Sequence, residues 1–145
     1  TPVWIAHPAK NNSTLQLSLD PAVIWAPFEP AAIRRLVASG KTVFVDVTAD
    51  WCITCQVNKN LVIKDPEVLA HLSADNVVSM RADWTRPDDE IARYLASFGR
   101  FGIPFNAIYG PNSPNGIVLS ELLTKTAVLN TLKNADFRSG LAKKR

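Results

Sequence analysis

One stretch of this 145-residue chain decides its fold, and it reads Phe44-Val45-Asp46-Val47-Thr48-Ala49-Asp50-Trp51-Cys52-Ile53-Thr54-Cys55. Residues 42–47 are rich in β-branched side chains and almost entirely apolar, which is typical of a strand covered on both faces in an α/β sheet. From Cys52 to about Leu61 the apolar positions change to a helical spacing. We therefore expect both cysteines in the first turn of a helix that follows a buried strand.

The segments around this stretch alternate between helical and extended patterns. Helical spacing, capping residues and first-turn acids predict helices over residues 30–40, 65–72, 88–98 and 124–132. Runs of β-branched and apolar residues predict strands over residues 77–82, 105–109 and 117–122. Between the last two strands, residues 110–116 are rich in Gly, Pro and Asn and predict a turn. This order predicts an α/β fold in which helices flank a mixed central β-sheet.

Length and composition favour one globular domain with short additions at both ends. The chain is 47% hydrophobic and 20% charged, and its net charge of +3 is spread thinly. This balance excludes a disordered chain and provides no basic face for nucleic acid. No apolar run approaches the roughly 18 residues of a membrane-spanning helix. We expect an N-terminal arm or linker over residues 1–29, a domain over residues 30–135 and a polar, basic tail over residues 136–145.

The arm has two open interpretations, because it could link a preceding domain or pack against the fold. Its polar residues 11–14 favour a lead-in segment rather than core. The chain begins at Thr1, with no initiator Met and no signal-peptide pattern. This start predicts a fragment processed or excised from a longer protein.

Cys52 and Cys55 are the only cysteines of the chain. A zinc site needs four ligands, and His7 and His71 do not provide the spacing of such a site. A purely structural disulfide would close too short a loop to restrict the unfolded chain much. Haem attachment needs a His directly after the second cysteine, where this chain has Gln56. The interpretation that remains is a redox-active dithiol that needs no metal or other cofactor.

Position along the helix separates the expected roles of the two cysteines. A first-turn thiol faces unpaired backbone N–H groups and the positive end of the helix dipole, which lower its pKa, so Cys52 is the expected nucleophile. Cys55 is expected to be more buried and to attack the mixed disulfide formed on Cys52. Asp46 is expected to be buried with a raised pKa and to take the proton from Cys55. The alternative for Asp46 is a structural, hydrogen-bonded Asp.

The charges around the motif predict the redox tendency of the dithiol. Ile53 and Thr54 bring no cation into the motif, while Asp46 and Asp50 oppose a thiolate. We therefore expect a reducing couple. A measured potential near that of a dedicated disulfide-forming enzyme would contradict this prediction.

Two further neighbours of the dithiol have open roles. Trp51 directly precedes Cys52 and either shields it or packs as a core aromatic. Lys59 follows Cys55 by four residues on the same helical face. Its side chain either tunes the local charge or is simply solvated.

Two motifs of the chain resemble hallmarks of the thioredoxin superfamily. Residues 44–55 resemble its strand-to-active-site segment, and Gly102-Ile103-Pro104-Phe105 resembles its cis-proline loop. The likeness covers residues 30–132 and implies a thioredoxin fold. Three shorter segments are similar to the C-terminal periplasmic domain of the membrane thiol:disulfide interchange reductases of the DsbD and ScsB kind, and they are residues 49–52, 82–85 and 98–104.

The resemblance implies a protein-disulfide reductase domain that performs thiol:disulfide exchange in the periplasm, as part of a bacterial inner-membrane protein. A transmembrane domain would bring electrons from cytoplasmic thioredoxin, and a partner domain or periplasmic thiol proteins would receive them. A cis Ile103–Pro104 peptide bond would face the dithiol and pair with the backbone of a docked partner. The expected partner-binding residues are Ile53, Thr54, Gly102, Ile103, Pro104 and Phe105.

One position departs from this resemblance. The best-known reductases of this kind carry an acid where this chain has Lys59, so the proton-handling role of that acid is not transferred and Asp46 is the main candidate. Three alternatives for the whole protein stay open. They are a stand-alone periplasmic thioredoxin-like reductase for cytochrome or copper-site assembly, a redox-idle binding or chaperone module, and a metal-delivery protein.

Overall fold

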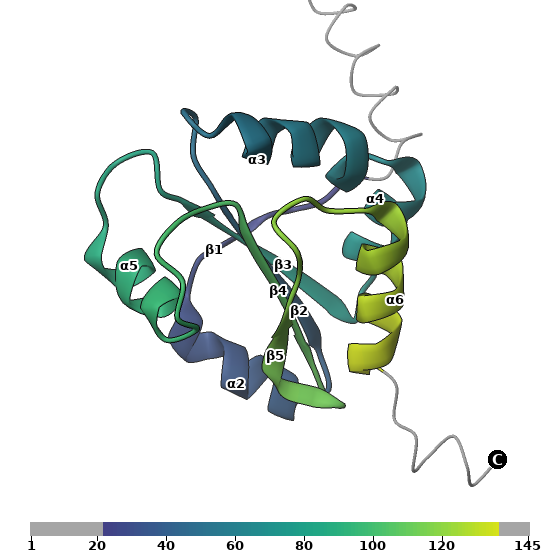
Figure 1. Ribbon diagram of the computed structural model, residues 1–145. Helices are drawn as coiled ribbons and strands as arrows, with labels where there is room; N and C mark the ends of the chain where they lie inside the picture. The colour runs from purple at the N-terminus through teal and green to yellow at the C-terminus, as the bar shows by residue number, and fades with distance from the viewer. Residues whose placement is uncertain (1–21, 137–145) are drawn as a thin grey trace, which may run out of the picture.

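The structure is a computed structural model that describes residues 22–136 (Figure 1). Residues 1–21 of the expected arm and residues 137–145 of the expected tail lie outside the described residues. The described strands are β1 (Ala26–Pro27), β2 (Thr42–Thr48), β3 (Val77–Asp83), β4 (Phe105–Gly110) and β5 (Ser113–Val118). The described helices are α2 (Pro30–Ala38), α3 (Ile53–Asn58), the π-helical η2 (Lys59–Ile63), α4 (Pro66–Leu72), α5 (Asp89–Ala96) and α6 (Lys125–Asp136).

The strands form one five-stranded sheet in the order β1-β3-β2-β4-β5. Strands β1, β3 and β2 run parallel, whereas β4 is antiparallel to β2 and β5 is antiparallel to β4. Helices α2 and α5 lie on one side of the sheet, and α3, α4 and α6 lie on the other (Figure 1). The mixed central sheet with flanking helices that the sequence predicts is confirmed. Within residues 22–136, no helix has the length and apolar character needed to cross a bilayer.

Alternation along the central strand β2 sends its side chains into two separate cores. One core lies against α2 and α5 and receives Val43, Val45 and Val47. The other lies under η2, α4 and α6 and is centred on Phe44, which is fully buried. Asp46 and Thr48 follow Phe44 at two-residue steps and therefore face the same side. The strand thus carries a buried carboxylate into the layer between the sheet and α3.

Strand β5 corrects the prediction for the hairpin. The expected hairpin is confirmed, because β4 and β5 pair antiparallel. Its expected turn over residues 110–116 is too long, because β5 begins at Ser113 and ends at Val118 rather than covering 117–122. β5 is an edge strand, where Pro114 removes no ladder hydrogen bond that the sheet needs. Gly116 adopts a positive φ of 92° and leaves room for the ring of Tyr109, which would lie 2.7 Å from a Cβ atom. A Pro- and Gly-rich strand of this kind is indistinguishable from a turn by composition.

Two further differences concern the segments around β2. Residues 22–29 belong to the expected arm, but they contribute strand β1, in which Ala26 pairs with Met80 of β3. The helix expected to end near Leu61 continues to Ile63, with its second half in π-helical geometry. Apolar spacing does not distinguish these helical forms over so few residues.

Strand β4 approaches helix α6 so closely at Gly110 that no side chain fits. A Cβ atom on Gly110 would lie 2.4 Å from the backbone oxygen of Ala135. We expect Gly110→Ala to lower the free energy of unfolding by about 1–3 kcal/mol, because the two backbones must separate. Urea denaturation measures this loss. Gly102→Ala is the matched control, since its Cβ would meet no atom within 4 Å, and equal losses in both variants would contradict the prediction.

Candidate active site

Cys52 and Cys55 form a disulfide at the amino end of α3, with their Cα atoms 5.2 Å apart. Cys52 is the N-cap of this helix, and its sulfur accepts a hydrogen bond of 3.2 Å from the backbone N–H of Cys55. Both cysteines therefore lie at the start of the helix, as the sequence predicts. The two residues are 6% and 5% exposed, so the greater burial expected for Cys55 is not observed. In the bridged form each cysteine side chain covers the other.

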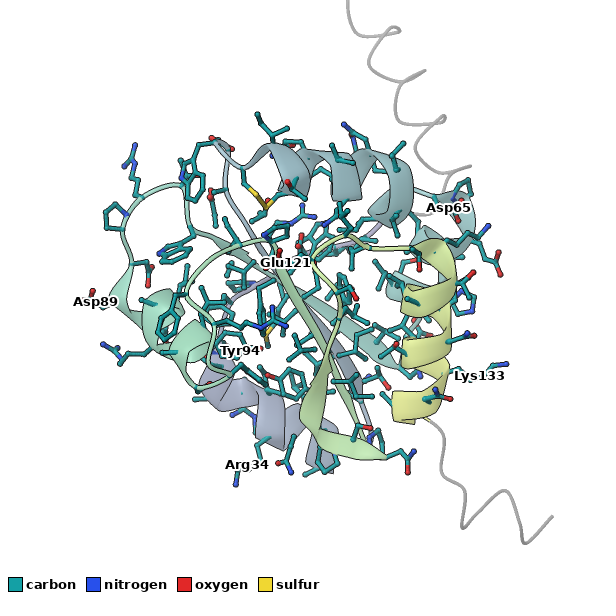
Figure 2. All side chains as sticks on the ribbon, in the orientation of Figure 1. Arg34, Asp65, Asp89, Tyr94, Glu121 and Lys133 are labelled. Atoms are coloured by element: carbon teal, nitrogen blue, oxygen red, sulfur yellow. A yellow bond between two sulfur atoms is a disulfide. The ribbon has the colours of Figure 1, made fainter. Side chains whose placement is uncertain are left out.

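The loop that precedes β4 packs against this disulfide. The Ile103–Pro104 peptide bond in this loop is cis, which is the geometry that the resemblance implies. Ile103 contacts the small buried cluster of Ala49, Cys52 and Cys55. Figure 2 shows the disulfide as the yellow bond beside the first turn of α3. Two motifs that lie far apart in the sequence thus meet at the dithiol.

The residues expected to bind a partner differ in their exposure. Ile53 is 79% exposed and Gly102 is also exposed, whereas Pro104 is buried. Phe105 is 1% exposed, and its ring packs against Tyr94 and Phe98. The Phe105 side chain is therefore not available to a partner in this structure. Alternation along β4 points this ring into the core under α2 and α5, from where it supports the loop.

Asp46 receives hydrogen bonds from both neighbouring strands. The sheet register aligns it with Arg81 of β3 and with Asn106 of β4. Arg81 Nε and Nη2 each lie 3.0 Å from Oδ2 of Asp46, and Asn106 Nδ2 donates to Oδ1 at 2.8 Å. Asp46 is 5% exposed and Asn106 is 2% exposed. The carboxylate is thus both buried and hydrogen-bonded, which combines the two interpretations open from the sequence.

Burial raises the pKa of the Asp46 carboxyl above its ordinary value. The Arg81 charge, the Asn106 hydrogen bond and the Lys59 charge all act in the opposite direction but do not cancel this effect. The raised pKa expected from the sequence is therefore confirmed. The pKa of Asp83 is lowered mainly by its hydrogen bonds from Thr85, and the charge of the half-buried Lys59 adds to this effect. This action on two carboxyl groups favours the charge-tuning interpretation of Lys59.

A loop after β3 holds the segment that leads into the cysteines. The Thr85 hydroxyl accepts a hydrogen bond of 2.9 Å from the Asp50 N–H, and the Thr85 carbonyl accepts one of 3.2 Å from the Trp51 indole N–H. Asp83 in turn accepts hydrogen bonds from the N–H and hydroxyl of Thr85. Trp51 remains 60% exposed, so it is not a core aromatic. No role for Thr85 follows from the sequence alone. Its place just after the end of a predicted strand is the one sequence feature that could have indicated a residue near the site.

Asn58 fixes the far end of α3 to the loop that follows β5. Its side-chain Nδ2 donates to the Glu121 carbonyl at 2.7 Å, and its Oδ1 accepts from the Leu123 N–H at 3.0 Å. The residue is 3% exposed. These two hydrogen bonds fix the position of the helix that carries the dithiol. The sequence does not mark Asn58, because its neighbours Gln56, Lys59 and Asn60 are also polar.

A mainly apolar hollow of about 490 Å³ opens beside the dithiol. It lies between the active-site segment, the loop after β3 and the loop that precedes β4. Its lining includes Trp51, Trp84, Pro87, Phe101, Gly102 and Ile103. Phe101 is 80% exposed at its rim. An apolar surface of this kind next to a reactive group is a typical feature of a site that receives another chain.

A C-x-x-C disulfide at the start of a helix, a cis-proline loop packed on it and a mixed α/β sheet define the class of thiol:disulfide oxidoreductases. The chain belongs to the thioredoxin-like family, whose model matches residues 24–111, more than half of its length. The resemblance seen in the sequence is thereby confirmed.

Curated relatives point to a narrower group. The chain is 36% identical over 73 residues to the thiol:disulfide interchange protein DsbD of Ralstonia nicotianae, a match that covers 50% of this chain and 12% of the relative. It is 35% identical over 81 residues to DsbD 1 of Pseudomonas aeruginosa, covering 56% of this chain and 13% of that protein. The chain thus spans only about an eighth of the length of these relatives.

Solved structures share the fold. The reduced C-terminal domain of DsbD from Neisseria meningitidis matches with a TM-score of 0.58 and 20% identity, covering 76% of this chain and 99% of that one. A thioredoxin from Thermus thermophilus matches with a TM-score of 0.60 and 23% identity, covering 83% of this chain and 92% of that one. These matches show that the fold is a thioredoxin fold. The Cys52–Cys55 disulfide together with the curated relatives shows that the chemistry of the site is thiol:disulfide exchange.

Proposed function

We propose that this domain is the electron-relay domain of a protein-disulfide reductase. A transmembrane domain of the same protein reduces the Cys52–Cys55 disulfide, and the dithiol then reduces disulfides of periplasmic proteins or of a partner domain. The observation that carries this proposal is the buried disulfide at the start of α3, packed against the cis-proline loop. The names of the curated relatives, which are thiol:disulfide interchange proteins, support the exchange chemistry. The direction of transfer and the periplasmic location are part of the proposal and follow from the sequence resemblance.

The proposed exchange moves two electrons to the partner in two steps. The Cys52 thiolate attacks one sulfur of the partner's disulfide, so that a mixed disulfide forms and the partner's other sulfur leaves as a thiolate. Cys55 then attacks the Cys52 sulfur, the Cys52–Cys55 bond forms, and the second partner sulfur leaves as a thiolate. We assign to Asp46 the proton that Cys55 loses in this second step, because it is a buried carboxylate with a raised pKa on the same side of the sheet.

The proposed docking surface combines the exposed residues of the motif with the cis-proline loop. Ile53 presents its side chain beside the dithiol, together with the partly buried Thr54. Gly102 and Ile103 border the apolar hollow, so a partner chain that pairs with the loop backbone can place an apolar side chain there. Pro104 contributes the cis geometry of the loop rather than exposed area.

The experiment that tests this proposal is the Cys55→Ser trap. Without the resolving thiol, the second step cannot occur, so we expect a stable mixed disulfide between Cys52 and the partner. Expression of the variant in a bacterial periplasm, followed by non-reducing electrophoresis and mass spectrometry, measures it. One or two discrete adducts support a relay domain, whereas many unrelated adducts indicate a general reductase. Cys52→Ser is the matched control and is expected to trap nothing; the absence of any adduct with Cys55→Ser contradicts the proposal.

A further inference from the structure

The segment beside strand β1 is linked to the buried carboxylate of Asp46 through a contact between Trp25 and Arg81. Trp25 lies next to the two-residue strand β1, in the part of the chain expected to be an arm. Its ring covers the guanidinium of Arg81, whose Cζ lies 3.7 Å from the ring centroid. The same indole also contacts Phe44, with ring centroids 6.2 Å apart. Trp25 is therefore anchored by the core and stacked on Arg81 at once.

Arg81 is the residue that joins this stack to Asp46. Its side chain is 24% exposed, and both Nε and Nη2 lie 3.0 Å from the same carboxylate oxygen. An arginine with this exposure has solvated rotamers available in which its guanidinium would leave Asp46. A ring that covers the guanidinium at this distance disfavours these rotamers, because each of them would break the cation–π contact. The stack thus favours the conformation in which Arg81 reaches Asp46.

We propose that Trp25 is a positioning residue that holds the Arg81 guanidinium against Asp46, so that the segment beside β1 sets the pH range in which the resolving step proceeds. This inference rests on the proposed role of Asp46 as the acceptor of the Cys55 proton. Neither Trp25 nor Arg81 touches the reacting sulfurs in this account. Both act through the carboxylate.

The direction of the effect follows from the charges that act on Asp46. Two cations act on it, Arg81 on β3 and Lys59 on η2. The neutral Asn106 amide on β4 donates a hydrogen bond to the same carboxyl group. Each of them favours the ionised carboxylate, which is the form that can accept a proton. When Arg81 moves away, the carboxylate protonates at higher pH. The rate of the resolving step then reaches its plateau at higher pH.

The test measures the resolving step directly in the reduced 145-residue chain. An aromatic disulfide such as dithiobis(nitrobenzoic acid) reacts with Cys52 to give a mixed disulfide and one aromatic thiolate. Attack by Cys55 closes the Cys52–Cys55 bond and releases the second aromatic thiolate. Stopped-flow absorbance of this second release, recorded across a pH series, gives the pH of half-maximal rate on the acid limb.

We expect Arg81→Gln to move this acid limb upward by about one pH unit or more, since loss of an adjacent opposite charge shifts a carboxyl pKa by that order. Trp25→Leu is expected to move it in the same direction by a smaller amount. Trp25→Phe keeps a ring face and Arg81→Lys keeps a positive charge. Each is therefore expected to shift the limb less than Trp25→Leu or Arg81→Gln, respectively. Arg93→Gln, an exposed arginine on α5, is the matched charge control and is expected to leave the limb unchanged.

Three outcomes overturn a statement of this account. If Asp46→Asn leaves the acid limb in place, Asp46 does not accept the proton and the proposed mechanism fails at that step. If Asp46→Asn removes the limb but Trp25→Leu leaves it at the wild-type pH, the positioning role of Trp25 is wrong while the mechanism stands. In the Asp46→Asn background, Trp25→Leu is expected to have no further effect, and an additional shift there also contradicts the inference.

Discussion

Replacing Cys52 by Ser is expected to reduce insulin-disulfide reduction to the uncatalysed rate. The serine hydroxyl is not ionised near neutral pH, so the variant has no nucleophile at the amino end of α3 to attack a disulfide. The remaining thiol of Cys55 is 5% exposed and points toward position 52 rather than toward a docked chain. Turbidity of the reduced insulin chain, with dithiothreitol as the electron source, measures the rate.

The matched control for Cys52→Ser is Thr126→Ser, which alters an exposed hydroxyl residue on α6. This variant is expected to keep the wild-type rate. Alkylation gives a second readout, because Cys52 of the reduced protein is expected to react faster at neutral pH than an ordinary free thiol. Faster alkylation of Cys55 than of Cys52 would reverse the assigned roles.

Replacing Phe44 by Ala is expected to give the largest loss of stability, about 3–5 kcal/mol in the free energy of unfolding. Phe44 is fully buried in the central strand, and its core includes side chains from η2, α4 and α6. Removal of the ring leaves a cavity between the sheet and three helices that cannot all move inward. Urea denaturation followed by circular dichroism measures the loss.

Phe101→Ala is the matched control for this prediction. It removes the same ring from a side chain that is 80% exposed, so its free energy of unfolding is expected to stay within about 0.5 kcal/mol of the wild type. Similar losses in the two variants would show that the core under α4 and α6 does not depend on Phe44. A second consequence concerns the site, because Trp25 packs on both Phe44 and Arg81. Phe44→Ala is therefore also expected to loosen the contacts around Asp46.

Local sequence patterns did not predict the bounds of strand β5 or the presence of strand β1. Pro114 and Gly116 lie within a strand, because an edge position tolerates a missing N–H and because the Tyr109 ring occupies the space beside Gly116. The strand β1 has two residues and no periodicity to detect. Both features depend on neighbouring strands of the sheet, and composition carries no information about such neighbours.

The sequence by itself determined the α/β class, the placement of both cysteines at the start of a helix and the burial of Asp46. These features follow from local causes: strand and helix periodicities, the spacing of two residues, and a single acid inside an apolar run. The expected reducing character of the couple stays a prediction.

Only the tertiary structure decided which groups surround the dithiol. Arg81 and Asn106 reach Asp46 because the sheet register places them opposite it, and Thr85 reaches Asp50 because the loops after two parallel strands end side by side. Trp25 joins this group through a strand too short to be recognised. Contacts between strands depend on register and chain order, and these are set by the packing of the whole sheet rather than by any one segment.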